Sequence, residues 1–124
     1  MIRLTLPEPP SANAYWRRAG TYLHRSHAAD RYIAAVKAAV AFAGIMQIRG
    51  AVELRFVWYR KKRSGDLDNR VKVLQDALKH GAFGDDGKVR RLVCEMSDDE
   101  PTHARVEVLV IPFVASEPGA LLAA

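Results

Sequence analysis

Apolar and polar residues alternate in several short stretches of the chain, as they do along a strand with one buried face. The alternation is clearest over 51–60, where every second residue from Val52 to Trp58 is large and apolar. Weaker alternation predicts three further strands, at 2–6, 89–96 and 103–111. These strands, with a short hairpin expected near residue 20, predict a small sheet of about four to five strands.

Two other stretches repeat apolar residues at helical spacing. The first predicted helix, 27–43, follows Ser26, a favourable N-cap, and ends before Gly44. The second predicted helix covers 67–79, and rotation at about 100° per residue gathers its large apolar residues into one stripe. Val73 and Ala77 form a small apolar patch beside that stripe, which we assign to the core in preference to an interface.

The remaining segments are predicted from prolines, glycines and small residues. The stretch 7–15 contains three prolines and is expected to be extended and rigid. Residues 15–18 and 21–25 flank Gly20 and predict an irregular hairpin. From Pro112 onward no periodicity remains, so 112–124 is expected to be a flexible tail.

The order strand, helix, strand, helix, strand, strand predicts an α+β fold with two main α-helices packed on one small mixed β-sheet. With 124 residues, of which 49% are hydrophobic, the chain has room for one domain, 1–124. The lone Cys94 excludes an internal disulfide, and we interpret it as a core-filling residue in a reducing compartment. No apolar run approaches the roughly 18 residues of a membrane span, and we expect a cytoplasmic location without membrane contact.

Charge divides the chain more sharply than its formal net value of +5 suggests. Residues 1–48 carry six basic and two acidic side chains, and residues 49–91 carry twelve and six. Residues 92–124 carry one basic and six acidic side chains. The cationic excess therefore lies in the first two-thirds, and the last third is acidic.

The densest cationic segment is Arg60, Lys61, Lys62 and Arg63, which directly follows Trp58 and Tyr59. Such a run attracts polyanions, and neutralising phosphates with release of counterions gives salt-dependent affinity for nucleic acid. An ordinary solvated loop has the same composition. The run alone leaves both interpretations open.

An acidic group follows within the same basic third. Asp66 and Asp68 stand at the entry to the second helix, and rotation places Asp68, Lys72 and Asp76 on one helix face, apart from the apolar stripe. Asp85 and Asp86 follow a turn containing Gly81 and Gly84, which would let the chain fold back towards the helix entry.

Carboxylates gathered beside cations have a specific chemical use. Hard divalent cations such as Mg²⁺ take carboxylate and phosphate oxygens, polarise the phosphate and activate water. A nearby Lys can stabilise the negative charge that develops on the phosphorus oxygens. The simpler interpretation is a helix cap, an ordinary Asp68–Lys72 pair and a polar turn at Asp85–Asp86. Spacing alone leaves both open.

Three separated stretches resemble the RusA-like Holliday junction resolvases. The first is Leu6 to Trp16, a Pro-rich entry that ends in Ser-x-Asn and an aromatic pair. The second is Asp66-Leu67-Asp68-Asn69, continued by Lys72 and by Asp76-Ala77-Leu78. The third is Asp85-Asp86 with Val89 three residues on. The link before Asp85-Asp86 is about one residue shorter than the family pattern suggests, and Gly84 replaces a larger apolar residue.

The resemblance implies a homodimeric endodeoxyribonuclease that resolves four-way DNA junctions by paired nicks in recombination and repair. It implies Mg²⁺ as cofactor, with Mn²⁺ able to substitute, and no organic cofactor. Carried over by position, the catalytic residues are Asp66, Asp68, Lys72 and Asp86, and the metal ligands among them are Asp66, Asp68 and Asp86. Support of the site is assigned to Asp85, Asn69, Asp76 and Asn13. DNA contacts are assigned to Arg60, Lys61, Lys62, Arg63, Arg17 and Arg18.

Two alternatives share most of these features. A module that binds branched DNA without cleaving it needs the basic surface but gains nothing from the acids. A related nuclease acting on other branched DNA has the same site and a different substrate. The joint presence of Asp66, Asp68, Lys72 and Asp86 favours cleavage over binding alone. A prophage origin is a further implication of the resemblance.

Overall fold

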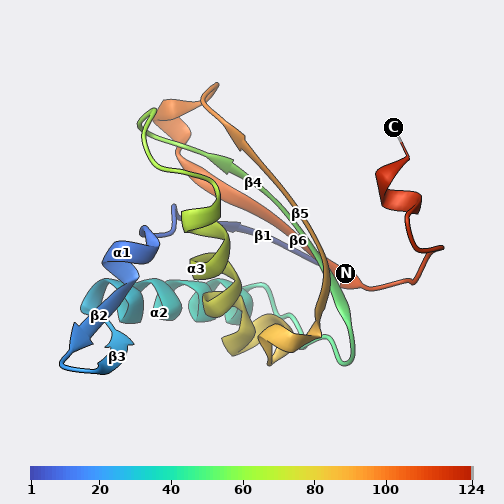
Figure 1. Cartoon of the computed structure of the whole chain (residues 1–124), viewed down its shortest axis with the longest axis horizontal. Helices are drawn as coiled ribbons and strands as arrows, with labels where there is room; N and C mark the ends of the chain where they lie inside the picture. The colour runs from blue at the N-terminus through green and yellow to red at the C-terminus, as the bar shows by residue number, and fades with distance from the viewer. Residues whose placement is uncertain (124) are drawn as a thin grey trace.

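A computed structural model describes residues 1–123, with every side chain in that range except that of Asp86. Its centre is a four-stranded mixed sheet in the order β1-β6-β4-β5 (Figure 1). β4 pairs with β6 in the antiparallel sense and with β5 in the parallel sense, and β1 pairs with β6 in the antiparallel sense. The strands are β1 (Ile2–Leu6), β4 (Val52–Tyr59), β5 (Val89–Ser97) and β6 (Arg105–Pro112).

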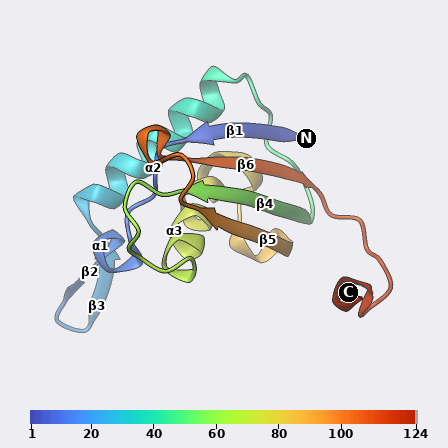
Figure 2. The same cartoon turned by 90° about the horizontal axis from the view of Figure 1, so that it is seen from above.

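Two helices cover one face of this sheet: α2 (His27–Phe42) and α3 (Asp68–Leu78) (Figures 1 and 2). Seen from above, α2 lies beside β1 and α3 lies under β4 and β5 (Figure 2). Helix α2 has the predicted N-cap, because Ser26 Oγ accepts a hydrogen bond from the Ala29 amide at 3.2 Å. The prediction of two main helices on a mixed sheet is thus confirmed, and the sheet has the smaller of the expected strand numbers.

The core lies between this sheet face and the helices. The alternation over 51–60 has the predicted direction, because Val52, Leu54, Phe56 and Trp58 are all buried. Val73 and Ala77 are also fully buried, as predicted. Cys94 is half-buried on β5, and burial raises the pKa of its thiol, which fits a packing role.

The segment between β1 and the predicted hairpin differs from the prediction. Residues 12–15 form a one-turn helix, α1 (Ala12–Tyr15), where an extended segment was expected. Ser11 explains the difference, because its side chain accepts a hydrogen bond from the Ala14 amide at 3.2 Å and starts the turn. The predicted hairpin is confirmed as β2 (Trp16–Ala19) and β3 (Tyr22–Arg25), with Gly20 at φ +63° in the connection.

A β4–α3–β5 crossover organises the rest of the domain. Because β4 and β5 are parallel, the chain leaves the Tyr59 end of β4, passes through α3 and re-enters beside Val52. A π-helical turn (Lys79–Phe83), labelled η1, extends α3, and a short 3₁₀ turn, η2 (Asp86–Lys88), leads into β5. Two further 3₁₀ turns are η3 (Pro101–His103) and η4 (Ala120–Leu122).

The C-terminal segment leaves the body after β6 (Figure 1). The amide of its first residue, Phe113, donates a hydrogen bond to the Ala51 carbonyl at 3.0 Å, and the Ser116 hydroxyl accepts a hydrogen bond from the Arg91 side chain at 3.1 Å. The flexibility of 112–124 stays a prediction. Along residues 1–123, no helix combines the length and the apolar character that crossing a bilayer requires.

Candidate active site

The entry to α3 presents two free carboxylates. Asp66 precedes the helix, Asp68 is its first residue, and both are exposed. Neither carboxylate has a hydrogen bond or ion pair to any part of the described residues 1–123. Acidic groups are favourable here because the amide groups of the first helical turn carry partial positive charge. The loop and the helix start therefore hold two carboxylates outward, towards solvent.

Lys72 lies one helical turn beyond Asp68 and is also exposed. Residues four apart on a helix lie on the same side, so the ammonium group and the Asp68 carboxylate share the outer face of α3. Asn69, between them in sequence, is half-buried. The outer end of α3 thus combines two acids and one cation without a competing partner for the acids.

Asp76 does not belong to that outer face, and this corrects the rotation argument. Its side chain is only 4% exposed and is enclosed by three donors. Arg25 donates from two nitrogens at 3.1 and 3.2 Å, Lys79 Nζ lies 3.0 Å away, and the Tyr15 hydroxyl donates a further hydrogen bond. Asp76 joins α3 to the α1 turn and the hairpin, which is a structural role.

The environment of Asp76 controls its ionisation. Burial alone raises the pKa of this carboxyl, but the hydrogen bonds from Arg25, Tyr15 and Lys79 outweigh burial and lower the pKa from 3.8 to about 2. Burial and the bond to Asp76 raise the pKa of the Tyr15 hydroxyl, so it stays a donor. The carboxylate is therefore ionised throughout the neutral and mildly acidic range.

This shift predicts how stability depends on pH. A depressed folded-state pKa contributes stability that is present above pH 3.8 and is lost as pH falls through about 2. Asp76→Asn should lower the free energy of unfolding by about 3 kcal/mol at pH 7, because the cations around it lose their partner. Urea unfolding of both proteins at pH 7, 4 and 3 checks this, with Asp99→Asn as an exposed carboxylate control. A constant difference between Asp76→Asn and wild type across that range would contradict the assignment.

Asp85 and Asp86 lie at the opposite end of α3 from Asp66 and Asp68. The pair follows the η1 turn after the helix, and Val89, three residues on, pairs with Val52 at the start of β4. The entry to α3 instead follows the far end of β4, and an 11-residue helix is about 16 Å long. Figure 1 shows the loop that enters α3 and the turn that follows it at opposite ends of the helix. The expectation that this turn folds back to the helix entry is wrong for a single chain.

The positions of the four acids at the two ends of α3 determine which of them could hold a metal ion. Among the described residues, no three His, Cys, Asp or Glu side chains lie close enough to hold an ion. Asp85 is exposed and accepts a hydrogen bond from the Gly87 amide at 3.2 Å, and the Asp86 side chain lies outside the described part. Mg²⁺ typically needs one or two protein carboxylates, with water and substrate phosphates completing its shell. The free, hard oxygen donors of Asp66 and Asp68 fit that requirement.

The basic segment 60–63 divides into two parts. Lys61, Lys62 and Arg63 are exposed in the loop that leads to Asp66. Arg60 is instead engaged: two of its nitrogens donate to the Asp98 carboxylate and a third donates to the Gly65 carbonyl at 3.0 Å. Its guanidinium is therefore already paired with a carboxylate and a backbone carbonyl.

The remaining predicted DNA contacts lie on the β2–β3 hairpin. Arg17 and Arg18 are exposed there, on the part of the molecule that projects beyond α1 (Figure 1). Asn13 is exposed on α1, the short turn that contacts α3. The hairpin thus adds a second group of free cations beside the helical layer.

Two residues near the loop were not singled out from the sequence. Glu8 accepts hydrogen bonds from Trp58 Nε1 at 2.9 Å and from the Lys61 amide at 3.2 Å. The Arg70 guanidinium lies 4.8 Å from the centre of a Trp58 ring and donates to the Pro9 carbonyl at 2.7 Å. Glu8 and Arg70 thus connect the Pro-rich segment to the start of the basic loop. Their partners are distant in sequence, so no local pattern predicts these contacts.

Exposed carboxylates beside exposed cations at one end of the domain are typical of a protein that processes phosphodiesters. In a protein that only binds polyanions, the carboxylates would repel the phosphates and weaken binding. The family model described as endodeoxyribonuclease RusA matches residues 7–111. The chain belongs to this RusA endodeoxyribonuclease family, and it is an endodeoxyribonuclease. It is similar to the crossover junction endodeoxyribonuclease RusA of Enterobacteria phage HK97, with 31% identity over 91 residues, covering 68% of this chain and 72% of that protein. The resemblance drawn from the three sequence stretches is thereby confirmed.

Proposed function

We propose that this chain is a Mg²⁺-dependent endodeoxyribonuclease that resolves four-way DNA junctions by paired nicks, in recombination and repair. The observation that carries the proposal is the pair of free carboxylates at Asp66 and Asp68 beside the exposed cations of the 61–63 loop. The similar phage protein is named for crossover junctions, which favours a branched substrate. A passive binding module would not need the two acids.

The residues divide the chemistry between them. Asp66 and Asp68, with Asp86, hold the metal, which when bound supplies Lewis-acid activation of the phosphate and of water. Lys72 stabilises the negative charge that develops on the phosphorus oxygens. Asn13, Asn69 and Asp85 support the site. The exposed cations that hold the DNA backbone are Lys61, Lys62, Arg63, Arg17 and Arg18.

The positions of the acids support the proposal of a homodimer. Because Asp86 lies at the far end of α3 in its own chain, we propose that it serves the α3 entry of the partner chain. The free edge of the sheet supports such pairing: β5 is the last strand, and Leu92, Val93 and Met96 on it are 38%, 45% and 37% exposed. A two-fold axis then supplies two sites, which paired cuts of a junction require.

The direct test is cleavage of labelled four-way, three-way and linear duplex DNA with Mg²⁺, Mn²⁺ or EDTA. We expect nicks in opposed strands of the four-way junction with Mg²⁺ or Mn²⁺, leaving 5′-phosphate and 3′-hydroxyl ends, and none with EDTA. Preferential cleavage of the three-way substrate would favour the related nuclease. Metal-independent binding without cleavage of any substrate would contradict the proposal and favour the binding module.

A further inference from the structure

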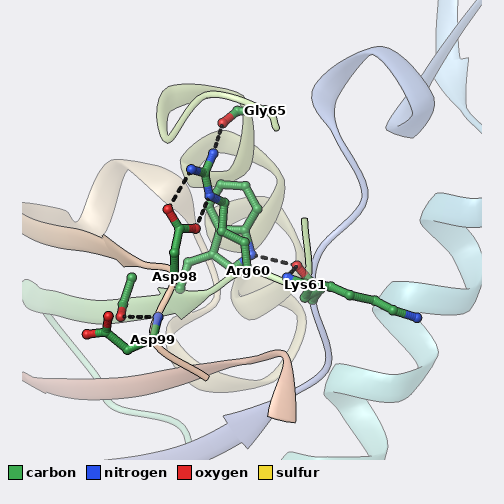
Figure 3. A network of polar contacts seen from close by, with 8 residues as sticks. Arg60, Lys61, Gly65, Asp98 and Asp99 are labelled. Atoms are coloured by element: carbon green, nitrogen blue, oxygen red, sulfur yellow. Dashed lines mark hydrogen bonds and ion pairs between the residues drawn. The ribbon is translucent and has the colours of Figure 1, made fainter. Parts of the chain in front are cut away.

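The root of the basic loop is fixed by a residue from the acidic C-terminal third. Figure 3 shows Arg60 at the end of β4 turned towards Asp98, which lies in the turn between β5 and β6. Arg60 Nη2 donates to Asp98 Oδ2 at 2.9 Å, and Nε donates to Oδ1, which makes the contact bidentate. The Arg60 amide also donates to the Ser97 carbonyl at 3.0 Å. Both the backbone and the side chain of Arg60 are thus tied to the same turn.

The same guanidinium also reaches the other end of the loop. Arg60 Nη1 donates to the Gly65 carbonyl at 3.0 Å, so one side chain joins the residue before the loop to the residue before Asp66 (Figure 3). Gly65 adopts φ +91°, a conformation that favours glycine, and a Cβ there would lie 3.2 Å from an Arg70 side-chain nitrogen. The turn that delivers Asp66 therefore requires a glycine at this position.

The Arg60 side chain is poorly placed to contact DNA itself. It is 12% exposed, and three of its five donors are engaged by Asp98 and Gly65. The Asp98 carboxylate also cancels the guanidinium charge, so a phosphate would have to displace a bidentate partner. By contrast, the Lys61 side chain extends away from this network (Figure 3).

We propose that Asp98 and Arg60 act as a positioning pair, which fixes the 61–65 loop and through Gly65 sets the place of Asp66 for cleavage. The inference rests on the proposed function of Asp66, and neither residue touches substrate. The hydrogen bond to Asp98 raises the pKa of Arg60, and the Asp66 charge adds a smaller contribution in the same direction, so the Arg60 guanidinium interacts electrostatically with both carboxylates.

The pair predicts an unusual set of kinetic effects. Asp98→Asn and Arg60→Lys should each lower kcat for junction cleavage by about 10-fold, because a displacement of about 1 Å in a reacting group has effects of that order or larger. Arg60→Lys keeps the charge, so a pure phosphate contact would tolerate it. The double variant should be no worse than either single variant, since both remove the same contact. Asp99→Asn is the matched control, because Asp99 is exposed in the same turn and its carboxylate points away from Arg60 (Figure 3).

Two further measurements test the positioning role of the pair. One distinguishes it from a direct contact with DNA, and the other does not depend on nuclease activity. The slope of log affinity against log salt should be unchanged in Asp98→Asn and in Arg60→Ala, whereas loss of a phosphate contact lowers it by about one. Trypsin should cut at Lys61, Lys62 or Arg63 several-fold faster in Asp98→Asn than in wild type or Asp99→Asn, because the loop is no longer tied at both ends. The trypsin result needs no nuclease activity, so it stands even if the proposed function fails.

Specific outcomes would overturn the positioning role. Wild-type kcat and wild-type trypsin rates in Asp98→Asn would do so. So would a reduced salt slope in Arg60→Ala together with wild-type behaviour of Arg60→Lys, which would identify Arg60 as a phosphate contact. Thermal unfolding of each variant, compared with Asp99→Asn, tests whether a faster cut reflects the loop or the whole domain. An equal gain in cutting throughout the chain would also contradict the proposal.

Discussion

Asp68→Asn is expected to reduce junction cleavage by about 10²–10³-fold or more, while leaving four-way junction binding at or above the wild-type level. The amide keeps the size of the side chain but removes a charged ligand that Mg²⁺ prefers. Asp68 is exposed and has no partner among the described residues, so the fold should be unaffected. Removing a negative charge from a surface that meets phosphates also reduces repulsion, which explains the retained or tighter binding.

Single-turnover cleavage and a gel-shift titration in EDTA measure the two effects separately. Asp99→Asn changes an exposed carboxylate in the turn between β5 and β6 and should behave as wild type in both assays. Unchanged cleavage by Asp68→Asn would remove this residue from the catalytic group. Loss of binding together with loss of cleavage would point to a structural defect, which unfolding curves would reveal.

The outer end of α3 could be predicted from the sequence because it depends on local geometry. Helical periodicity fixes that Asp68 and Lys72 share a side, and the apolar stripe fixes which side faces the sheet. β4 was predictable for the same reason, since strict alternation specifies its buried face. The cap at Ser26 belongs to the same class of local signal.

Asp76 could not be placed by the same reasoning. Its rotation angle lies close to that of Lys72, but Tyr15 and Arg25 come from 61 and 51 residues earlier and enclose it. Whether a polar residue at the margin of a helix face is buried depends on what packs there. Arg60 illustrates the same limit, because its partner Asp98 lies 38 residues further along the chain.

The location of Asp85 and Asp86 would be predictable if the direction of each strand were known. Once β4 and β5 are known to be parallel neighbours, the connection between them must run back along the full length of the strands, and its two ends must lie at opposite ends of those strands. The order of elements predicts a mixed sheet, but it does not identify which pair is parallel. The relative direction of β4 and β5, and not residue spacing, therefore decides whether Asp85 and Asp86 can meet Asp66 and Asp68 within one chain.

The largest qualitative effect is expected from mixing two inactive variants. If Asp86 serves the partner chain, a heterodimer of Asp68→Asn and Asp86→Asn has one site with both changes and one site with neither. Co-expression with two affinity tags and purification through both should yield a protein that nicks one strand of a four-way junction. Random pairing of equal amounts gives about half heterodimers, so an unselected mixture should have roughly a quarter of the wild-type sites.

The mixing experiment has a built-in control, because Asp66→Asn with Asp68→Asn removes two acids that lie at the same end of α3. Every site in that heterodimer contains one changed residue, so no activity should return. If each site were built within one chain, Asp68→Asn mixed with Asp86→Asn would also stay inactive. Recovery in the first mixture and not in the second requires that the two ends of α3 act in different chains. Such recovery is the result that the separation seen along β4 and α3 predicts.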